Sequence, residues 1–125
     1  SAGMLRLLGH ATRMMREECN GRFVWSLVRD EFVKDLDVQR FDSDPIIDVL
    51  RSGREVEAVA LFSEQEDGRV NVSLRSRGVP DMNVVARQFG GGGHAHAAGT
   101  TLPAKTAEHD MHSLVAVVRR ALSAD

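Results

Sequence analysis

The chain is poor in several residue types, and each shortage excludes a class of protein. Its 125 residues include one cysteine, Cys19, which excludes both an intramolecular disulfide and a thiolate metal cluster. No apolar run approaches the roughly 18 residues that a membrane-spanning helix needs. No basic, then apolar, then small-residue segment of a secretory signal opens the chain. We therefore expect a cytoplasmic protein with no membrane partner.

The chain also lacks an excess of basic residues. Sixteen Lys and Arg stand against eighteen Asp and Glu, which gives a net charge of −2. Proteins that bind long nucleic acid usually carry a basic excess. Any polyanion that this chain binds must therefore contact a local patch of basic residues. A short ligand suits this charge balance better than a long duplex. The fractions of hydrophobic residues, 42%, and charged residues, 27%, are ordinary for a soluble globular domain.

The length is that of one domain. Residues 1–3, which precede Met4, resemble the remnant of an expression tag, and we expect the natural protein to extend upstream of them. Residues 4–125 are expected to share one hydrophobic core.

Hydrophobic periodicity predicts an α/β domain in which helices are layered on a mixed β-sheet. Asp44-Pro45 and Asp81 are typical helix starts, and Asp67-Gly68 is typical of a tight hairpin turn. The helices are expected over 4–19, 44–52, 81–89, 94–98 and 107–122, and the strands over 22–28, 55–62, 69–77 and 100–102.

Four consecutive glycines, 90–93, point to a binding function. Glycine loses more backbone entropy on folding than any other residue, so such a run favours a sharp turn or a close approach. If a short helix starts at His94, its unpaired N–H groups and dipole create an anion site. His94 can donate to a phosphate oxygen. Arg75 and Arg77, on the polar face of the preceding strand, carry guanidinium groups that suit phosphate. These residues predict a phosphate-binding site.

Two segments carry a family resemblance. GGGHAHAAG, at 91–99, resembles the GGGHxxAAG signature of the domain associated with DHH-family phosphoesterases, subtype one. SLRSRG, at 73–78, resembles the SLRS segment of the same family. The resemblance implies a two-lobed phosphoesterase. Its N-terminal DHH lobe, absent from this chain, would hold manganese, and a C-terminal lobe similar to this chain would bind the substrate's phosphate and base.

The resemblance also implies which residues contact substrate. The chain alone is expected to hold no cofactor and to lack catalytic residues. His96 stands where similar sequences carry a longer polar or basic residue, and we include it as a substitute. The expected contacts, carried over position by position, are Arg75, Ser76, Arg77, Gly91, Gly92, Gly93, His94 and His96.

The four-glycine form is most similar to the oligoribonuclease (nano-RNase) group, which also dephosphorylates 3′-phosphoadenosine 5′-phosphate. This implies a short single-stranded RNA or a nucleotide as substrate and the DHH lobe of the same protein as partner, with a homodimer left open. A RecJ-like exonuclease or a cyclic dinucleotide phosphodiesterase would use a similar lobe. The rival functions from other classes are a freestanding single-stranded nucleic-acid-binding module and a protein-interaction domain.

Each candidate also has a plainer interpretation. The glycines would suit a flexible linker, but periodic helices flank them. The arginines would suit a solvated strand face. Trp25 is expected in the core rather than stacked on a base, and Cys19 on the buried stripe of a helix. Metal-like spacings also occur at His94-x-His96, His109-x-x-His112, Asp35-x-Asp37 and Asp42-x-Asp44, but they lie on predicted polar surfaces and predict no metal site.

Overall fold

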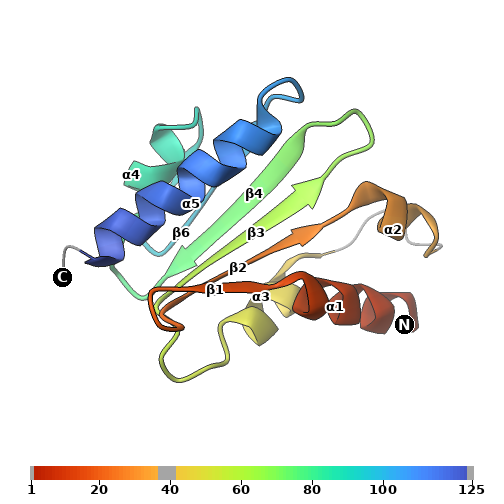
Figure 1. Cartoon of the computed structure of the whole chain (residues 1–125), viewed down its shortest axis with the longest axis horizontal. Coiled ribbons are helices and arrows are strands. Elements are labelled where there is room, and N and C mark those ends of the chain that lie inside the picture. The colour runs from red at the N-terminus through yellow and green to blue at the C-terminus, as the bar shows by residue number, and fades with distance from the viewer. Residues whose placement is uncertain (1, 37–41, 124–125) are drawn as a thin grey trace.

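One mixed β-sheet with helices on both faces makes up the fold (Figure 1). The computed structural model describes residues 2–36 and 42–123. The helices within these ranges are α1 (Ala2–Met14), α2 (Asp30–Lys34), α3 (Asp44–Leu50), α4 (Met82–Arg87) and α5 (Ala107–Ser123). The strands are β1 (Arg16–Glu18), β2 (Phe23–Val28), β3 (Ala58–Glu64), β4 (Val70–Ser76), β5 (Gly92–Gly93) and β6 (Ala97–Leu102).

The sheet has the strand order β1-β2-β3-β4-β6-β5. β2 and β3 run parallel, and every other neighbouring pair is antiparallel. The predicted α/β class with a mixed sheet is therefore confirmed. None of the described helices is both long and apolar enough to cross a lipid bilayer.

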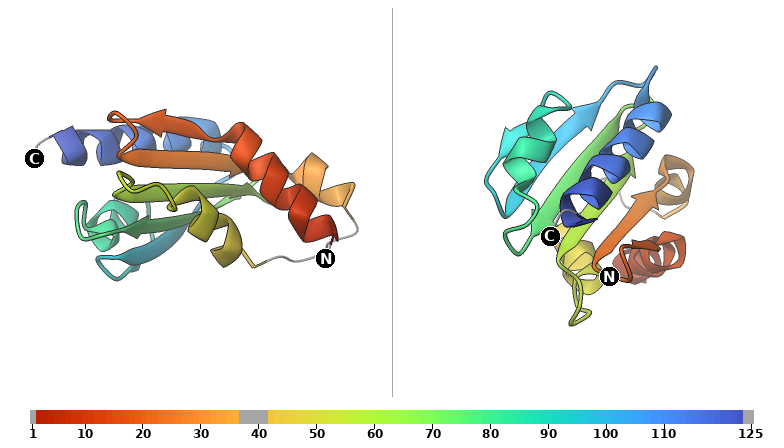
Figure 2. Two further views of the ribbon diagram at one scale, coloured as in Figure 1. Left: turned by 90° about the horizontal axis from the view of Figure 1, so that it is seen from below. Right: turned by 60° about the vertical axis from the view of Figure 1, so that its left-hand side comes forward.

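The central strand β3 divides the core into two layers, because successive side chains of a strand point to opposite faces. Ala60 and Phe62 belong to the apolar cluster under α4 and α5. Val59 and Leu61 belong to the cluster under α1 and α3. The sheet is thus covered by α4 and α5 on one face and by α1 and α3 on the other (Figures 1 and 2).

β4 has one apolar and one polar face, as its alternation predicts. Val72 and Leu74 are buried in the α4/α5 cluster. Ser73 and Arg75 point to the face of α1 and α3, because they alternate with those residues. α1 packs on β2 and α3 on β3, so the polar face of β4 lies beside α3.

Several local signals are confirmed. Gly68 adopts a φ of 89° in the β3–β4 turn, and the Arg69 amide donates to Asp67 Oδ1 over 3.0 Å. Asp81 accepts from the amides of Asn83 and Val84 at the start of α4. At α3 the prediction is off by one residue, because Ser43 occupies the N-cap position and Asp44 is the first helical residue.

The predicted helix over 4–19 is wrong at its C-terminal end. α1 ends at Met14, and β1 then pairs with β2 so that Arg16 lies opposite Trp25. Cys19 and Asn20 have φ values of 54° and 55° in the turn between the two strands. Cys19 is therefore half-buried in a turn and does not lie on a helix stripe. Helical spacing could not reveal this end, because β1 is stabilised by its partner strand.

Two further elements differ from expectation. α1 begins at Ala2, so it includes two residues of the expected tag remnant. α2 was not predicted, and Asp37 of the first Asp-x-Asp spacing lies outside the described residues. In the second spacing, Asp42 Oδ1 accepts the Asp44 amide over 3.0 Å at the start of α3.

His10 links α1 to the start of α2. Its Nε2 accepts the Arg29 amide over 3.3 Å, and its ring stacks on Phe32 with centroids 4.1 Å apart. Burial, followed by the charge of Arg29, lowers the pKa of His10 below its ordinary value of 6.5, because both disfavour the imidazolium. The contact therefore depends on a neutral ring.

We expect protonation of His10 to destabilise the fold. Its folded-state pKa lies below the unfolded one, so the stabilisation is complete above 6.5 and is lost as pH falls through the folded-state value. The melting temperature should fall more between about pH 7.5 and about pH 5 in the wild type than in His10→Gln. His109→Gln changes an exposed histidine, so its melting temperature should depend on pH as that of the wild type does. Equal pH dependence of wild type and His10→Gln would contradict the assignment.

Candidate functional site

The glycine-rich segment forms a β-hairpin. β5 pairs with β6 so that Gly92 lies opposite Gly99 and Gly93 opposite Ala98. The turn is closed by the His94 amide, which donates to Ala97 O over 2.8 Å, and by the reverse bond over 3.2 Å. The predicted helix over 94–98 is therefore wrong. A five-residue helix would satisfy few of its own backbone groups, whereas the hairpin adds to an existing sheet.

Four amides that were expected to face an anion already have acceptors within the protein. The amides of Gly90 and Gly91 donate to carbonyls at the end of α4, Arg87 O over 3.3 Å and Ala86 O over 2.9 Å. The Gly93 amide donates to Asn83 Oδ1 over 3.0 Å. The His94 amide closes the hairpin turn. The expectation of an anion site at a helix N-terminus is therefore wrong.

Steric constraints explain most of the glycine run. A Cβ on Gly91 would stand 2.1 Å from Gly99 O, and one on Gly93 would stand 2.6 Å from Ala98 Cα. Gly90 has a φ of 83°, which strains other residues. Gly92 differs, since the nearest atom to its Cβ would be Asn83 Oδ1 at 3.5 Å, an ordinary contact. Three of the four glycines are thus required by the chain's own backbone.

Ser76 holds the hairpin turn against the end of β4. Its hydroxyl lies 2.7 Å from Pro80 O and 3.2 Å from Ala95 O, and it accepts the Gly78 amide over 3.2 Å. The Met82 amide also donates to Ala95 O, over 2.8 Å. The structure therefore places Ser76 as a link between two segments, with its hydroxyl already engaged.

Arg75 extends along the face of the sheet that carries α3. Its guanidinium donates to Leu74 O over 2.9 Å and to Asp44 Oδ1 over 3.4 Å. The side chain of Arg75 is 26% exposed and that of Asp44 is 66% exposed, so solvent screens the ion pair. These contacts restrict the Arg75 side chain. Because the ion pair is exposed to solvent, the guanidinium can still attract an anion.

Three arginines line one shallow depression: Arg51, Arg75 and Arg77. Its volume is about 10 Å³. Arg77 follows β4 and is exposed, and its amide donates to Glu57 O over 3.0 Å. The Glu57 carboxylate, which also lines the depression, is paired with Arg22.

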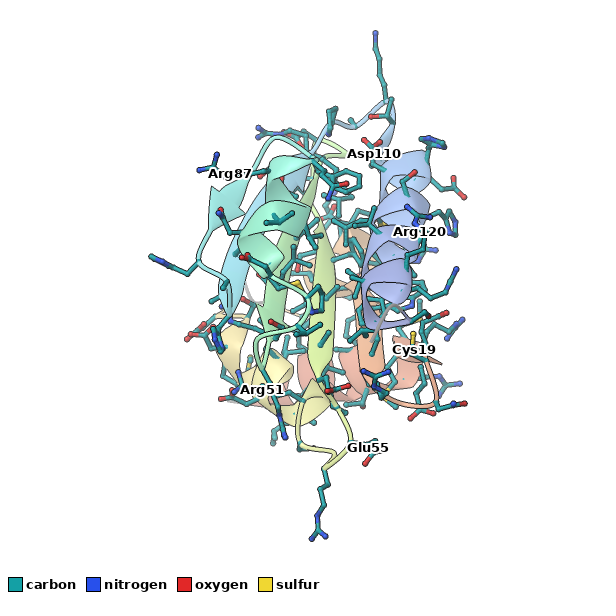
Figure 3. All side chains as sticks on the ribbon, turned by 90° about the vertical axis from the view of Figure 1, so that its left-hand side faces the viewer. Cys19, Arg51, Glu55, Arg87, Asp110 and Arg120 are labelled. Atoms are coloured by element: carbon teal, nitrogen blue, oxygen red, sulfur yellow. The ribbon has the colours of Figure 1, made fainter. Side chains whose placement is uncertain are left out.

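Arg51 is the member of this group that sequence reasoning missed. It caps the C-terminus of α3, far from β4 along the chain. Figure 3 shows Arg51 at the opposite end of the molecule from Arg87, so Arg87 does not contribute. Only the packing of α3 on the sheet brings Arg51 to the end of β4, and no local sequence signal could have found it.

Both predicted histidines lie at the hairpin turn, at the same end of the sheet as the arginines. His94 and His96 are exposed. The Ser76 amide donates to His96 O over 3.0 Å, and Arg75 lies opposite Ala97. The structure thus gathers the two histidines, Arg75 and Arg77 at one end of the sheet. It places Gly91 and Gly93 within the backbone that supports the turn.

The remaining candidates do not join this group. Trp25 is half-buried, and its ring meets Phe62 edge-on with centroids 5.9 Å apart. Cys19 Sγ lies 3.8 Å from Arg119 O. His109 and His112 are exposed on α5. Among the described residues no three or more His, Cys, Asp or Glu side chains are grouped so that they could hold a metal ion.

The sequence matches one family and a curated relative. A model of the DHHA1 domain family matches residues 20–124. The chain is 34% identical over 82 residues to the bifunctional oligoribonuclease and PAP phosphatase NrnA of Thermus thermophilus. That match covers 66% of this chain and 25% of NrnA, so the chain spans about a quarter of its relative.

Solved structures share the fold. An exopolyphosphatase-related protein from Bacteroides fragilis superimposes with a TM-score of 0.82 at 23% identity. The match covers 98% of this chain and 37% of the Bacteroides chain. The pGpG-specific phosphodiesterase PggH from Vibrio cholerae gives 0.72 at 12% identity, covering 96% and 40%. The C-Ala domain of Aquifex aeolicus alanyl-tRNA synthetase gives 0.58 at 20% identity, covering 87% and 99%.

We expect alanine to be tolerated at Gly92 and not at Gly91. Gly91→Ala forces a methyl group against Gly99 O and should lower the free energy of unfolding by about 2 kcal/mol or more. Gly92→Ala should change it by less than about 1 kcal/mol, because its Cβ has room. Urea unfolding of both variants measures the difference. Equal losses would show that close approach of β5 to β6 does not explain the glycines.

Proposed function

Because the chain belongs to the DHHA1 domain family, we propose that it is the lobe of a DHH-family phosphoesterase that holds the phosphate of a nucleotide substrate. The observation that carries this proposal is the depression lined by Arg51, Arg75 and Arg77 beside the hairpin turn. Guanidinium groups bind phosphate oxygens through two parallel hydrogen bonds. His94 and His96 add donors at the rim of the same end.

The size of the depression supports a shared site. A volume of about 10 Å³ admits roughly one water-sized group, so it can seat a phosphate oxygen but cannot enclose a nucleotide. In this proposal the substrate lies across the depression, and the DHH lobe covers it from the other side. The arginines hold the phosphate group, and the turn residues flank it.

The proposed catalytic step lies outside this chain. Within the part of the chain that the structure describes, no three or more His, Cys, Asp or Glu side chains are grouped as a metal site requires. We propose that the DHH lobe holds manganese and that the whole protein works in the cytoplasm. This chain would bind and orient the ester without breaking it.

The proposed substrate is a short oligoribonucleotide or 3′-phosphoadenosine 5′-phosphate. The activities of the chain's relative NrnA of Thermus thermophilus, an oligoribonuclease and PAP phosphatase, support this choice. The net charge of −2 supports it as well, because the nearly balanced charge gives a long polyanion no overall attraction to the chain.

We expect the chain to bind adenosine 5′-monophosphate and not adenosine. In an NMR titration, the phosphate should shift the amides of residues 76–78 and 94–97, because these flank the arginines. With manganese added, the chain should hydrolyse neither a di-adenylate nor 3′-phosphoadenosine 5′-phosphate. Affinity that rises more than about tenfold from a two- to a ten-nucleotide strand would favour a freestanding nucleic-acid-binding module instead. Shifts centred elsewhere would refute the site.

We expect Arg51 to contribute to phosphate affinity. Arg51→Gln should weaken binding of adenosine 5′-monophosphate about three- to tenfold, because it removes one charge from the depression. Arg54→Gln is the matched control, since Arg54 is exposed on the same loop but does not line the depression. If both variants change the dissociation constant equally, Arg51 acts only through the overall surface charge and does not contact the phosphate.

A further inference from the structure

A second concave site lies on the other face of the sheet. It is lined by Trp25 and Leu27 of β2 and by Ala107 and Met111 of α5, and its volume is about 380 Å³. Ligand pockets in proteins typically measure roughly 300–1,000 Å³. Trp25 and Leu27 pack against the α4/α5 cluster, whereas Arg75 faces α3. We call this site the tryptophan groove.

The tryptophan groove and the arginine depression also lie at opposite ends of the strands. The groove is lined by Glu64, the last residue of β3, and by Val70, the first of β4. The depression is lined by Ala58, the first residue of β3, and by Ser76, the last of β4. In Figure 3, Asp110 in the first turns of α5 and Arg51 mark these two ends. One ligand of nucleotide size cannot occupy both.

The groove belongs to a seam of apolar side chains that the fold leaves incompletely covered. α5 packs over β3 and β6, and the side chains of Trp25 and Leu27 on β2 are only half-buried beside it. Trp25, Leu27, Met111 and Val117 are among the partly buried side chains of this cluster, whereas Phe62, Leu114 and Val118 are fully buried. Partly exposed apolar side chains with charged residues beside them, as in this groove, are typical of a binding surface.

The indole of Trp25 is held in one orientation. Its Nε1–H donates to Glu18 Oε2 over 3.3 Å, and its ring meets Phe62 at an interplanar angle of 89°. Glu18 is fixed in turn by Arg119, whose Nη2 lies 2.8 Å from Glu18 Oε1. A preorganised aromatic ring binds a flat ligand at a low cost in conformational entropy.

The charged residues of the groove favour a cation. The lining includes two carboxylates, those of Glu64 and Glu108, and one guanidinium, that of Arg29. His112 is the remaining titratable residue of the lining. The two carboxylates and one guanidinium together carry one net negative charge. Glu64 is held in place by the Asp30 amide, which donates to its Oε1 over 3.2 Å. Positive charge also binds favourably over an indole ring.

We propose that the tryptophan groove binds a small aromatic cation, with the ring against Trp25 and Met111 and the ammonium or guanidinium group near Glu108 and Glu64. Thioether sulfur and indole both make favourable contacts with aromatic rings. The proposal does not depend on the phosphate-binding function of the arginine depression, because the two sites share no lining residue.

Trp25 is the sole tryptophan of the chain, which has no tyrosine, so its fluorescence reports on this groove alone. Phenethylamine should change the Trp25 emission saturably, with a dissociation constant on the order of millimolar for so small a ligand. Phenylacetate, which has the opposite charge, should bind at least about fivefold more weakly. Cyclohexylethylamine, which lacks the aromatic ring, should also bind more weakly. A response that does not saturate, or equal binding of phenylacetate, would overturn the proposal.

A pair of variants tests whether the Glu108 carboxylate contributes to binding of the cation. Glu108→Gln should weaken phenethylamine binding about two- to fivefold, because it removes one carboxylate from the lining. Glu66→Gln, altered at an exposed glutamate outside the lining, should bind as the wild type does. Phenethylamine should shift the amides of Gly68, Ala104 and Ala107, which line the groove. Equal affinities of the two variants, or shifts centred on other residues, would refute the site.

Competition separates the two proposals. Saturating adenosine 5′-monophosphate should leave the phenethylamine titration unchanged, and Glu108→Gln should leave nucleotide binding unchanged. If the nucleotide competes with phenethylamine, the groove is itself a nucleotide site and the aromatic-cation assignment fails. If the nucleotide binds nowhere while phenethylamine binds as described, only the phosphate proposal fails.

Discussion

The close approach of the β5 backbone to β6 is the constraint on which the candidate site depends. Gly91 and Gly93 have no room for a Cβ against Gly99 and Ala98, so the hairpin can form only with glycine at these positions. The hairpin in turn carries the His94–Ala97 turn to the end of β4, where Ser76 and Met82 bind Ala95 O. The glycine run thus positions polar side chains. It does not itself present a row of free amides.

The charge of the site comes from side chains instead, and one helix sets its distribution. α3 contributes Asp44, which pairs with Arg75, at its first residue and Arg51 at its C-terminal cap. Ile46, Ile47 and Leu50 bury the opposite side of the helix against Val59 and Leu61. Apolar packing beneath α3 therefore fixes where both charges stand relative to β4. A change in that core would alter the electrostatics of the depression without touching an arginine.

Local signals in the sequence predicted most of the fold. Asp67-Gly68, Asp81 and the alternation of β4 depend on neighbours in sequence, and all three are confirmed. The C-terminal end of α1 and the hairpin turn over 92–99 were mispredicted, because β1 and β5 are only three and two residues long and are stabilised by pairing with β2 and β6 rather than by a periodicity of their own. Arg51 was missed because it reaches the end of β4 only through the packing of α3 on the sheet. The site residues carried over by resemblance remain predictions, although the structure gathers most of them at one end of the sheet.

The two concave regions differ in what they need from the rest of a larger protein. The arginine depression is shallow and charged, and solvent screens its charges until another surface covers them. On the proposed function, phosphate binding there strengthens when a second lobe excludes water from the arginines. The tryptophan groove already has a volume of about 380 Å³ and an indole held by a hydrogen bond, so the proposed aromatic cation would find its whole site within this chain. On the two proposals, the isolated chain therefore contains every residue of the aromatic-cation site, whereas its phosphate site is completed by a second lobe.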